Sequence, residues 1–350
     1  MSARPDVHLR ILQPGPQSTV QDRGRHGFQA YGVPVCGALD GAALWLANAL
    51  VGNAAGLAGL EIRLAGPVFE VIGGPARLAL AGAQADIEVT VADGTSRYGA
   101  WRAIDVPERA RVRIGLLRGS GCAVLAFAGG VAVPVVLGSR ATDLKGRFGG
   151  HEGRALAAGD ELPLGEGAVH GPCLELPSPP RTPEEVVLRA VPGPQAEAFT
   201  QDARDAFFAT PYRVSHEADR MGMRLEGPPL AFRAGSDIVS DGIATGSVQV
   251  PGSGLPIVLL ADHQTIGGYP KIATVISADL ALAGRLMPGA LLRFRAVDVA
   301  EGEEACRARE AQIARLIASL TPVRADARID AAALYGANLI SGVVTALESG

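Results

Sequence analysis

The first half of the chain is dominated by short apolar stretches whose spacing predicts β-strands. Apolar and polar residues alternate in these stretches, and Gly, Asp and Pro separate them, as is typical of strands that bury one face. Residues 15–34 are polar and punctuated by glycine, which predicts a long loop. The expected strands cover residues 9–12, 60–64, 68–72, 77–81, 87–91 and 111–117, and the apolar run 122–138 is expected to form two more.

Longer segments with the spacing of amphipathic helices are few. Asp40 stands in the position of an N-cap before a helix that we expect over residues 41–51. Pro194 is placed to open a second helix that reaches about residue 208, because a first helical residue needs no amide donor. A third helix is expected over residues 303–320, where apolar residues follow a helical period.

The second half also predicts strands, and one of its loops is unusually rich in polar residues. This loop, 262–271, lies between apolar β-branched stretches, and a Pro-Gly-Ser-Gly turn at 251–254 precedes it. Loops between short buried strands often carry binding and catalytic groups, because the strands fix them in place. The expected strands cover residues 186–191, 248–250, 257–260, 272–276 and 292–297.

A Pro-rich stretch near the middle of the chain predicts a linker between two domains, because it can continue neither a strand ladder nor a helix. We therefore expect an N-terminal β domain at 1–176, a linker at 177–184 and a C-terminal β domain at 185–300. Residues 301–350 are expected to form a C-terminal helix and tail, and the apolar middle of the tail, after residue 328, should pack on the body.

Composition agrees with a two-domain globular protein. The chain has 350 residues, of which 48% are hydrophobic and 19% charged, enough for two domains with cores of their own. Its 45 glycines and 24 prolines favour short strands joined by turns. The formal net charge of −4 argues against electrostatic binding of nucleic acid.

The cysteines and the N-terminus indicate a soluble cytoplasmic protein. The 4 cysteines are far apart and form no CxxC pair, so neither a zinc ribbon nor a disulfide framework is expected. The N-terminus lacks the apolar core of a signal peptide. The longest apolar run contains Gly129, Gly130 and Pro134 and is short for a membrane span, so we expect no membrane contact.

Familiar cofactor motifs are absent from the sequence. It has no GxxxxGK[ST] phosphate loop, no GxGxxG after a strand, no GxSxG and no HExxH, and its 6 histidines are scattered, so no metal site is expected. No lysine neighbours a methionine, as a biotin-bearing hairpin would require. Any ATP or biotin used in a reaction would therefore have to be brought by other polypeptides.

Several sequence blocks nevertheless follow one another in a recognisable order. They are STVQDRGRHGFQAYGVPVCGALD (18–40), LANALVGN (46–53), LEIRLAGP (60–67), ATDLKGRFGGHEGRAL (141–156), SHEADRMGMRLEGPPL (215–230), SDGIATGSVQVPGSGLPIVLLADHQTIGGYPKIATVISADL (240–280) and RLMPGALLRFRAV (285–297). Together they resemble the biotin-dependent carboxyltransferase family, which includes 5-oxoprolinase C subunits and one half of the carboxyltransferase domain of urea carboxylase. His263 departs from the family pattern, which has a basic residue there.

The resemblance implies a fold and three possible functions. The fold is mostly β with a few helices, arranged as tandem cyclophilin-like β-barrel domains. The first function is that of the C subunit in an ATP-dependent 5-oxoprolinase complex, which opens 5-oxoproline to glutamate together with an A subunit and a KipI-like B subunit. The second is transfer of a carboxyl group from carboxybiotin on a partner to urea or another small amide. The third is that of a KipA-like regulatory protein, which binds a KipI-like partner without catalysis.

Activating a lactam or urea requires donors that polarise the carbonyl and an acceptor for the N–H proton. We expect Asp262 to act as a general base or to orient an amide, and Lys271 or Arg220 to bind a carboxylate or carboxybiotin oxygen. The alternatives are a strand-end cap for Asp262 and a salt bridge from Arg220 to Asp219 or Glu226. The expected substrate-binding residues are Gln249, Gln264, Thr265, Gly267, Gly268 and Tyr269 in the second half and Asp22, Arg23 and Lys145 in the first.

Overall fold

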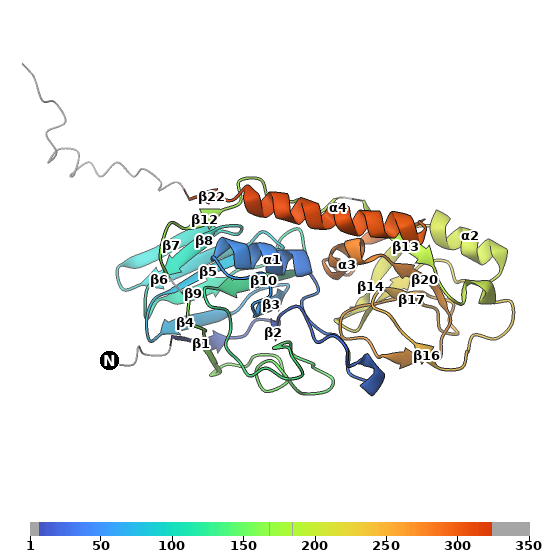
Figure 1. Ribbon diagram of the computed structural model, residues 1–350, viewed down its shortest axis with the longest axis horizontal. Coiled ribbons are helices and arrows are strands. Elements are labelled where there is room, and N and C mark those ends of the chain that lie inside the picture. Colours follow the sequence, from blue (N-terminus) through green and yellow to red (C-terminus); the bar gives the residue numbers. More distant parts are fainter. Residues whose placement is uncertain (1–6, 168, 184, 324–350) are drawn as a thin grey trace, which may run out of the picture.

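The computed structural model describes residues 7–323 apart from residues 168 and 184, and its first half consists of two packed β-sheets. They occupy the left of Figure 1. In spatial order, the larger sheet contains β11 (Glu161–Pro163), β1 (His8–Gln13), β4 (Val68–Ile72), β9 (Arg111–Ile114), β6 (Asp86–Val91) and β7 (Gly94–Gly99). The smaller one contains β2 (Gln17–Gln21), β3 (Gly59–Arg63), β10 (Cys122–Phe127), β5 (Ala76–Ala81) and β8 (Ala103–Val106).

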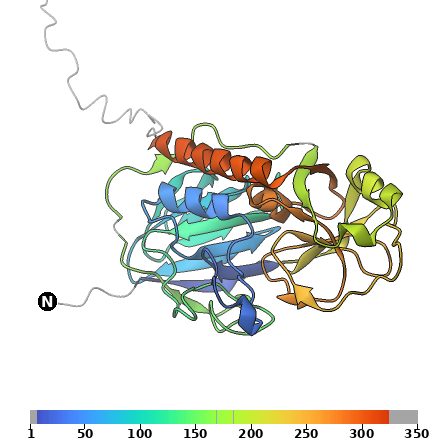
Figure 2. The ribbon, with the colours of Figure 1, turned by 45° about the vertical axis from the view of Figure 1, so that its right-hand side comes forward.

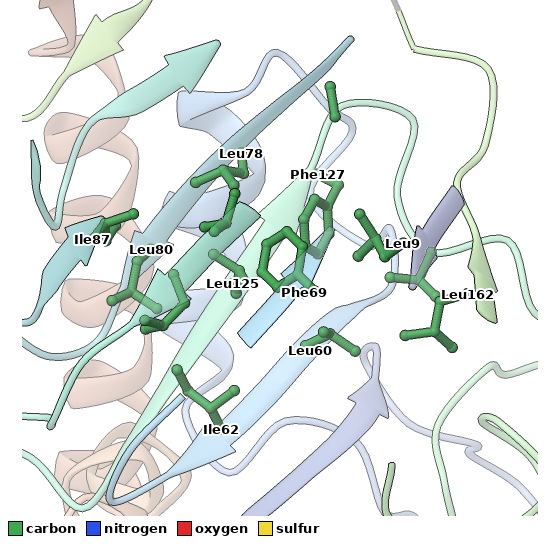
Figure 3. Close-up of a cluster of buried hydrophobic side chains, with 14 of the residues drawn as sticks. Leu9, Leu60, Ile62, Phe69, Leu78, Leu80, Ile87, Leu125, Phe127 and Leu162 are labelled. Atoms are coloured by element: carbon green, nitrogen blue, oxygen red, sulfur yellow. The ribbon is translucent and has the colours of Figure 1, made fainter. Parts of the chain in front are cut away.

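The core of the first half lies between these two sheets. Alternate residues of strands from both sheets belong to one buried cluster, as Figure 3 shows for Leu60, Phe69 and Phe127. The rings of Phe69 and Phe127 meet edge to face with their centroids 5.8 Å apart. Every residue of β5 and β10 is buried, because helix α1 (Gly41–Leu50) covers the face of the smaller sheet that points away from this core.

The strands of the first half were predicted well where apolar and polar residues alternate along them. The strands expected at 60–64, 68–72, 77–81, 87–91 and 111–117 are confirmed within a few residues, and so is the N-cap of α1, where the Asp40 carboxylate accepts from the Ala43 N–H at 2.9 Å. Two predictions were wrong. The loop expected at 15–34 contains strand β2, and the run 122–138 contains one strand, β10, instead of two.

In the second half, seven strands close a barrel. Most neighbours are antiparallel, but the first and last strands of the barrel pair in parallel. Around the barrel, the order is β13 (Val186–Pro192), β20 (Lys271–Val275), β17 (Ser247–Gln249), β18 (Ile257–Leu259), β15 (Gly222–Glu226), β14 (Tyr212–Ala218) and β21 (Leu291–Ala296). The predicted class, mostly β with a few helices, is confirmed.

Helices pack against the outside of the barrel and along the first half. Helix α2 (Gln201–Ala209) packs Phe207 on Phe294 of the barrel with ring centroids 4.4 Å apart. The helix begins at Gln201, after a Thr200 N-cap and a 3-10 turn η2 (Ala196–Ala198), so the predicted start at Pro194 was wrong. Helix α3 (Ser277–Gly284), which follows β20, was not predicted.

Helix α4 (Val299–Ala318) spans both halves of the molecule. It runs along the top of Figure 1 over α1 and α3, and Figure 2 shows the same arrangement from another side. Its start is fixed by a capping box between Asp298 and Glu301, a few residues before the predicted start at 303. Short pairs complete the fold: β12 (Leu174–Glu175) with β22 (Thr321–Pro322), and β16 (Asp241–Gly242) with β19 (Ile266–Gly267).

Two predictions are not tested by the described residues. The domain limits at 177–184 and 300 stay a prediction. The large sheets of the first half and the barrel share no strand, but β12, before the linker, pairs with β22, beyond residue 300. The tail after residue 328 lies outside the described residues. Among the residues that the structure describes, no helix combines the length and hydropathy needed to cross a membrane.

Candidate functional site

A cavity of about 570 Å³ lies beside the barrel and contains three of the expected substrate-binding residues, Gln249, Gln264 and Tyr269. Gln249 ends strand β17, and the other two belong to the polar loop that follows β18. Strands β14, β15 and β18 provide the rest of the wall. The remaining lining residues are His216, Glu217, Ala218, Asp219, Met221, Gly222, Arg224, Ile257 and Leu259.

The two glutamines of this cavity hold each other in place. Gln249 is only 2% exposed, and its Oε1 accepts from Gln264 Nε2 at 3.3 Å. Its own Nε2 faces the Tyr269 carbonyl oxygen at 3.5 Å, the limit of a hydrogen bond, so this donor is poorly satisfied. The pair therefore offers amide donors and acceptors beside a wall that is partly apolar.

Because Gly267 has no side chain, the Gln249 amide can occupy the space beside it. A Cβ at this position would lie 2.9 Å from Gln249 Nε2 and 2.9 Å from the Ile243 side chain, closer than real Cβ contacts. The neighbouring residues of the loop are tied by their backbones, because the Thr265 carbonyl accepts from Ile243 and the Gly268 carbonyl accepts from Ile238. The expected residues Gly267, Gly268 and Thr265 thus shape the loop around the glutamine pair.

Lys271 fastens this loop to the ribbon formed by β16 and β19. Its Nζ donates to Asp241 Oδ2 at 2.7 Å and to the Gly242 carbonyl at 3.1 Å, and its side chain is 3% exposed. The hydrogen bond from Lys271 holds the pKa of Asp241 below its ordinary value. Lys271 is not among the residues that line the cavity of Gln249, so its present contacts are those of a structural tie.

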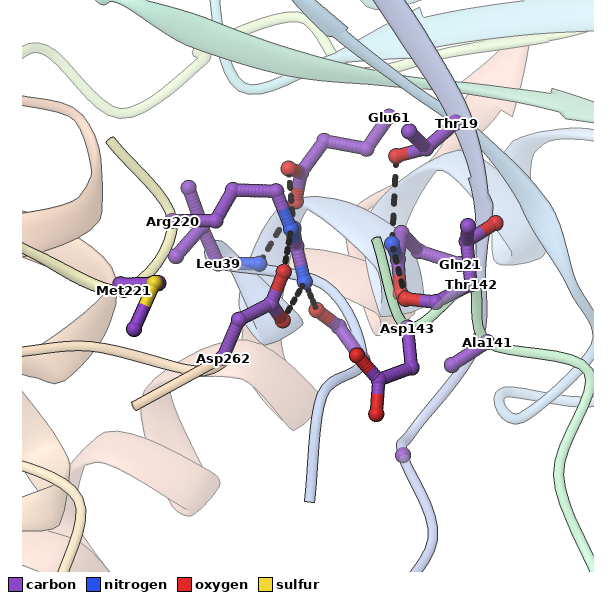
Figure 4. Close-up of polar contacts among 12 residues, drawn as sticks. Thr19, Gln21, Leu39, Glu61, Ala141, Thr142, Asp143, Arg220, Met221 and Asp262 are labelled. Carbon is purple, nitrogen blue, oxygen red and sulfur yellow. Dashed lines mark hydrogen bonds and ion pairs between the residues drawn. The ribbon is translucent and has the colours of Figure 1, made fainter. Parts of the chain in front are cut away.

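Arg220 and Asp262 pair with each other, and the guanidinium also reaches the first half. Its Nε and Nη2 donate to the two Asp262 oxygens at 2.9 and 2.8 Å, and Nη1 donates to Glu61 on β3 (Figure 4). A further bond runs from Nη2 to the Gly37 carbonyl at 2.7 Å. These charged groups are almost completely buried. The salt bridge anticipated for Arg220 exists, but with Asp262 and Glu61 in place of Asp219 or Glu226.

The charges in this network stabilise one another. Burial alone would lower the pKa of the Arg220 guanidinium, but the carboxylates of Glu61 and Asp262 outweigh it and raise the pKa. Both Asp262 oxygens accept from a charged donor and the residue is 3% exposed, so this arrangement does not present the carboxylate to a substrate. The network joins the barrel to the first half, since Arg220 lies between β14 and β15 and Glu61 on β3.

The expected residues of the first half lie elsewhere. The Asp22 carboxylate accepts from Gly24 N–H, Ser139 Oγ and Arg140 N–H, and so it anchors a loop. The Arg23 guanidinium lies over the Trp45 ring, 5.4 Å from its centroid, and Lys145 is exposed. None of these three residues lines the cavity of Gln249.

Sequence reasoning did not single out Glu61 and assigned no role to His263. Glu61 is a charged residue at a fully buried strand position between Leu60 and Ile62, which is a signal for an internal ion pair. His263 is buried, with Nε2 3.0 Å from Thr245 Oγ1 and Nδ1 2.6 Å from the Gln264 carbonyl oxygen. Burial lowers its pKa. Within the described part of the chain, no group of three or more metal-binding side chains occurs.

Comparison with known proteins shows which family the chain resembles. The family model for the carboxyltransferase domain, subdomain A and B, matches residues 31–296. The chain is 40% identical over 308 residues to the 5-oxoprolinase C subunit of Escherichia coli, covering 87% of this chain and 95% of that protein. It is 32% identical over 306 residues to a putative urea carboxylase of Emericella nidulans, covering 83% of this chain and 24% of the other.

A solved structure of a related protein has a similar fold. The crystal structure of the K. lactis urea amidolyase superposes with a TM-score of 0.80 at 26% identity, over 90% of this chain and 20% of that protein. The chain therefore spans about a fifth of this larger relative. The chain belongs to the family of carboxyltransferase domains with subdomains A and B.

Proposed function

We propose that the chain acts as the C subunit of a 5-oxoprolinase complex that opens 5-oxoproline to glutamate. The observation that carries the proposal is its 40% identity to a 5-oxoprolinase C subunit, over 95% of that protein. The likeness to urea carboxylase is lower, at 32% identity, and extends over 24% of the relative. The substrate class, a small amide, suits the cavity of Gln249.

The cavity offers what a lactam requires. A lactam presents one carbonyl acceptor and one N–H donor on adjacent atoms, and each carboxamide of Gln249 and Gln264 presents the complementary pair. In this proposal Gln249 Nε2, whose present bond is long, donates to the lactam oxygen. A donor aimed at the developing oxyanion contributes about 3 kcal/mol to catalysis. Tyr269, 42% exposed, offers its ring to the face of the lactam.

The three residues expected to be catalytic act in this proposal as positioning residues. Lys271 holds the loop that carries Gln264 and Tyr269, through Asp241 and Gly242. Arg220 and Asp262 fix the start of the same loop against the first half through Glu61. Because the sequence contains no phosphate loop, activation by ATP falls to the partner A and B subunits.

The test is reconstitution of the complex. The full-length chain is co-expressed with the A and B subunits, and glutamate formation from 5-oxoproline is measured with and without ATP. We expect turnover only with all three chains and ATP. Glutamate formation by this chain alone, or by the other two subunits at the full rate without it, would contradict the proposal.

A second function, carboxyl transfer from carboxybiotin to an amide, is favoured by the matching carboxyltransferase family model. The cyclic urea of biotin presents a carbonyl next to an N–H, as a lactam does, and one further N–H, so the glutamine pair fits it as well. When bound, this group would supply the carboxyl. The test is transfer of labelled carboxyl from a biotinylated carrier to urea. Transfer would favour this function, whereas tight binding to a KipI-like partner without either turnover would favour the regulatory one.

A further inference from the structure

A second cavity, of about 300 Å³, shares no lining residue with the cavity of the glutamine pair and has a different chemistry. It is lined by the loop around Asp22 and Arg23 and by helices α1, α3 and α4, so both halves of the chain contribute to it. Its apolar wall consists of Leu39, Leu44, Trp45, Leu280 and Ile313. Its size suits a small molecule with a single ring.

Two arginines line this cavity, the exposed Arg23 and the half-buried Arg309. Neither Arg23 nor Arg309 forms an ion pair with any residue that the structure describes; Arg309 donates to Gln312 Oε1 at 2.8 Å, and Arg23 lies over Trp45. Burial lowers the pKa of the Arg309 guanidinium, the positive charge of Arg285 adds to this effect, and the charges of nearby aspartates only partly offset it. An anion bound in the cavity would stabilise the charged guanidinium of Arg309.

The carboxylates of the cavity do not take that role. Asp22 already accepts three hydrogen bonds, from Gly24, Ser139 and Arg140. Glu310 is exposed on α4, and no ion pair within the described residues joins it to the neighbouring Arg309. The cavity therefore keeps two guanidinium groups available to a ligand.

Backbone N–H groups beside the cavity also favour an anion. The first residues of two helices, Gly41 and Ala42 of α1 and Ser277 and Ala278 of α3, line the cavity. Their N–H groups have no hydrogen-bond partner in the part of the chain that is described, and no side chain caps α3. The positive ends of two helix dipoles thus point to the region where the arginines lie.

We propose that this cavity is a binding site for a small carboxylate that carries an apolar ring. Arg309 and Arg23 pair with the carboxylate, for which the planar guanidinium is the best-matched partner, and the ring lies against Leu44, Trp45 and Ile313. The site is separate from the glutamine pair and does not depend on the function proposed above. Because α1, α3 and α4 all contribute, a bound ligand tightens the contact between the two halves.

Tryptophan fluorescence tests this site directly, because the chain has 2 tryptophans and only Trp45 lines the cavity. Trp101→Phe leaves Trp45 as the single reporter in the full-length chain. The probes are cyclohexanecarboxylate, its neutral analogue cyclohexanecarboxamide and inorganic phosphate, none of which absorbs at the excitation wavelength. We expect the carboxylate to give a saturable change with a dissociation constant on the order of 1 mM, and both other probes to bind about tenfold more weakly.

Two variants of the cavity and one control distinguish the site from a non-specific effect. Arg309→Gln should weaken carboxylate binding about tenfold, whereas Arg307→Gln, an exposed residue on the same helix, should leave it unchanged. Ala281→Leu fills the cavity without removing a charge and should abolish binding, while circular dichroism checks that each variant is folded. Equal affinity for carboxylate and carboxamide, equal affinity for phosphate, or an unchanged affinity in Arg309→Gln would overturn the proposal.

Discussion

Arg220 and Asp262 form a buried bidentate ion pair, although 42 positions separate them in the chain. The same guanidinium bonds to Glu61, which lies 159 positions away in the other half of the molecule. One side chain thus satisfies two buried carboxylates. A buried charge is tolerated only when it is paired, so each member of this network depends on the other two.

Removing the shared cation should therefore be costly. Arg220→Met keeps much of the side-chain volume but leaves Glu61 and Asp262 without their counter-charge, and we expect it to lower the free energy of unfolding by about 3–5 kcal/mol. Urea denaturation followed by circular dichroism measures this. The control is Arg224→Met on the adjacent strand, where the guanidinium pairs with an exposed Glu217 and should contribute less than about 1 kcal/mol. Equal effects of the two substitutions would show that the network does not stabilise the fold.

Gln264 provides the test of the lactam cavity. It is only partly buried and its side chain makes a long bond of 3.3 Å to Gln249, so Gln264→Ala should fold normally. In the assembled complex, we expect kcat/KM for 5-oxoproline to fall about tenfold, because a hydrogen bond to the substrate is lost. Gln201→Ala on the surface of α2 is the matched control and should keep the wild-type value. An unchanged kcat/KM in Gln264→Ala would move the substrate elsewhere.

Gly267 tests whether the position of Gln249 matters. In Gly267→Ala, the added Cβ would meet Gln249 Nε2 and Ile243 at 2.9 Å, so the buried amide must shift. We expect a loss of about 1–2 kcal/mol in stability and a larger proportional loss of kcat/KM. Gly242→Ala lies opposite Ile266 in the same ribbon and meets nothing within 4 Å, so both quantities should change little. Chemical denaturation and steady-state kinetics on the same preparations compare the two variants. Full activity in Gly267→Ala would mean that catalysis tolerates displacement of the Gln249 amide.

The strand pattern was readable from the sequence where one face of a strand is apolar, and unreadable where polar residues are buried. The sequence predicts a loop in place of β2 because Ser18, Thr19 and Gln21 are polar, yet all three are buried. The Ser18 hydroxyl donates to the Pro14 carbonyl, and Gln21 donates to Thr19 and to the Thr142 carbonyl. Their partners lie partly outside the local sequence, so no local pattern could reveal that the strand is interior.

The candidate site shows the same difference between residues that are close in the sequence and residues that are brought together only by the fold. Gln249, Gln264 and Tyr269 lie in one cavity because one hairpin and its loop carry them all, and their role in binding stays a prediction. Asp22 and Lys145 were also expected to bind substrate, from loops of the first half, but they lie away from that cavity, since only the packing of the two halves decides where their loops go. The Glu61–Arg220 contact was missed for the same reason: nothing in a single sequence links positions so far apart.

His263 makes stability depend on pH. The imidazole is buried between Thr245 and the Gln264 carbonyl, and burial lowers its pKa from the ordinary value of 6.5. The unfolded chain therefore binds a proton more readily than the folded one. As the pH falls through 6.5 toward the lower folded value, the free energy of unfolding must decrease, whereas above 6.5 this contribution is fully present.

Comparing the pH dependence of unfolding in two histidine variants isolates this effect. Between about pH 7.5 and about pH 5.5, the wild type should lose more stability than His263→Gln, which has no group to titrate at this position. His26→Gln is the control, because His26 is exposed and its removal should leave the pH dependence of the wild type intact. Urea denaturation at each pH gives the free energies. Parallel curves for the wild type and His263→Gln would mean that the buried imidazole accepts a proton without cost. This requires the Thr245 hydroxyl to turn and accept a hydrogen bond from Nε2, while the Gln264 carbonyl goes on accepting from Nδ1.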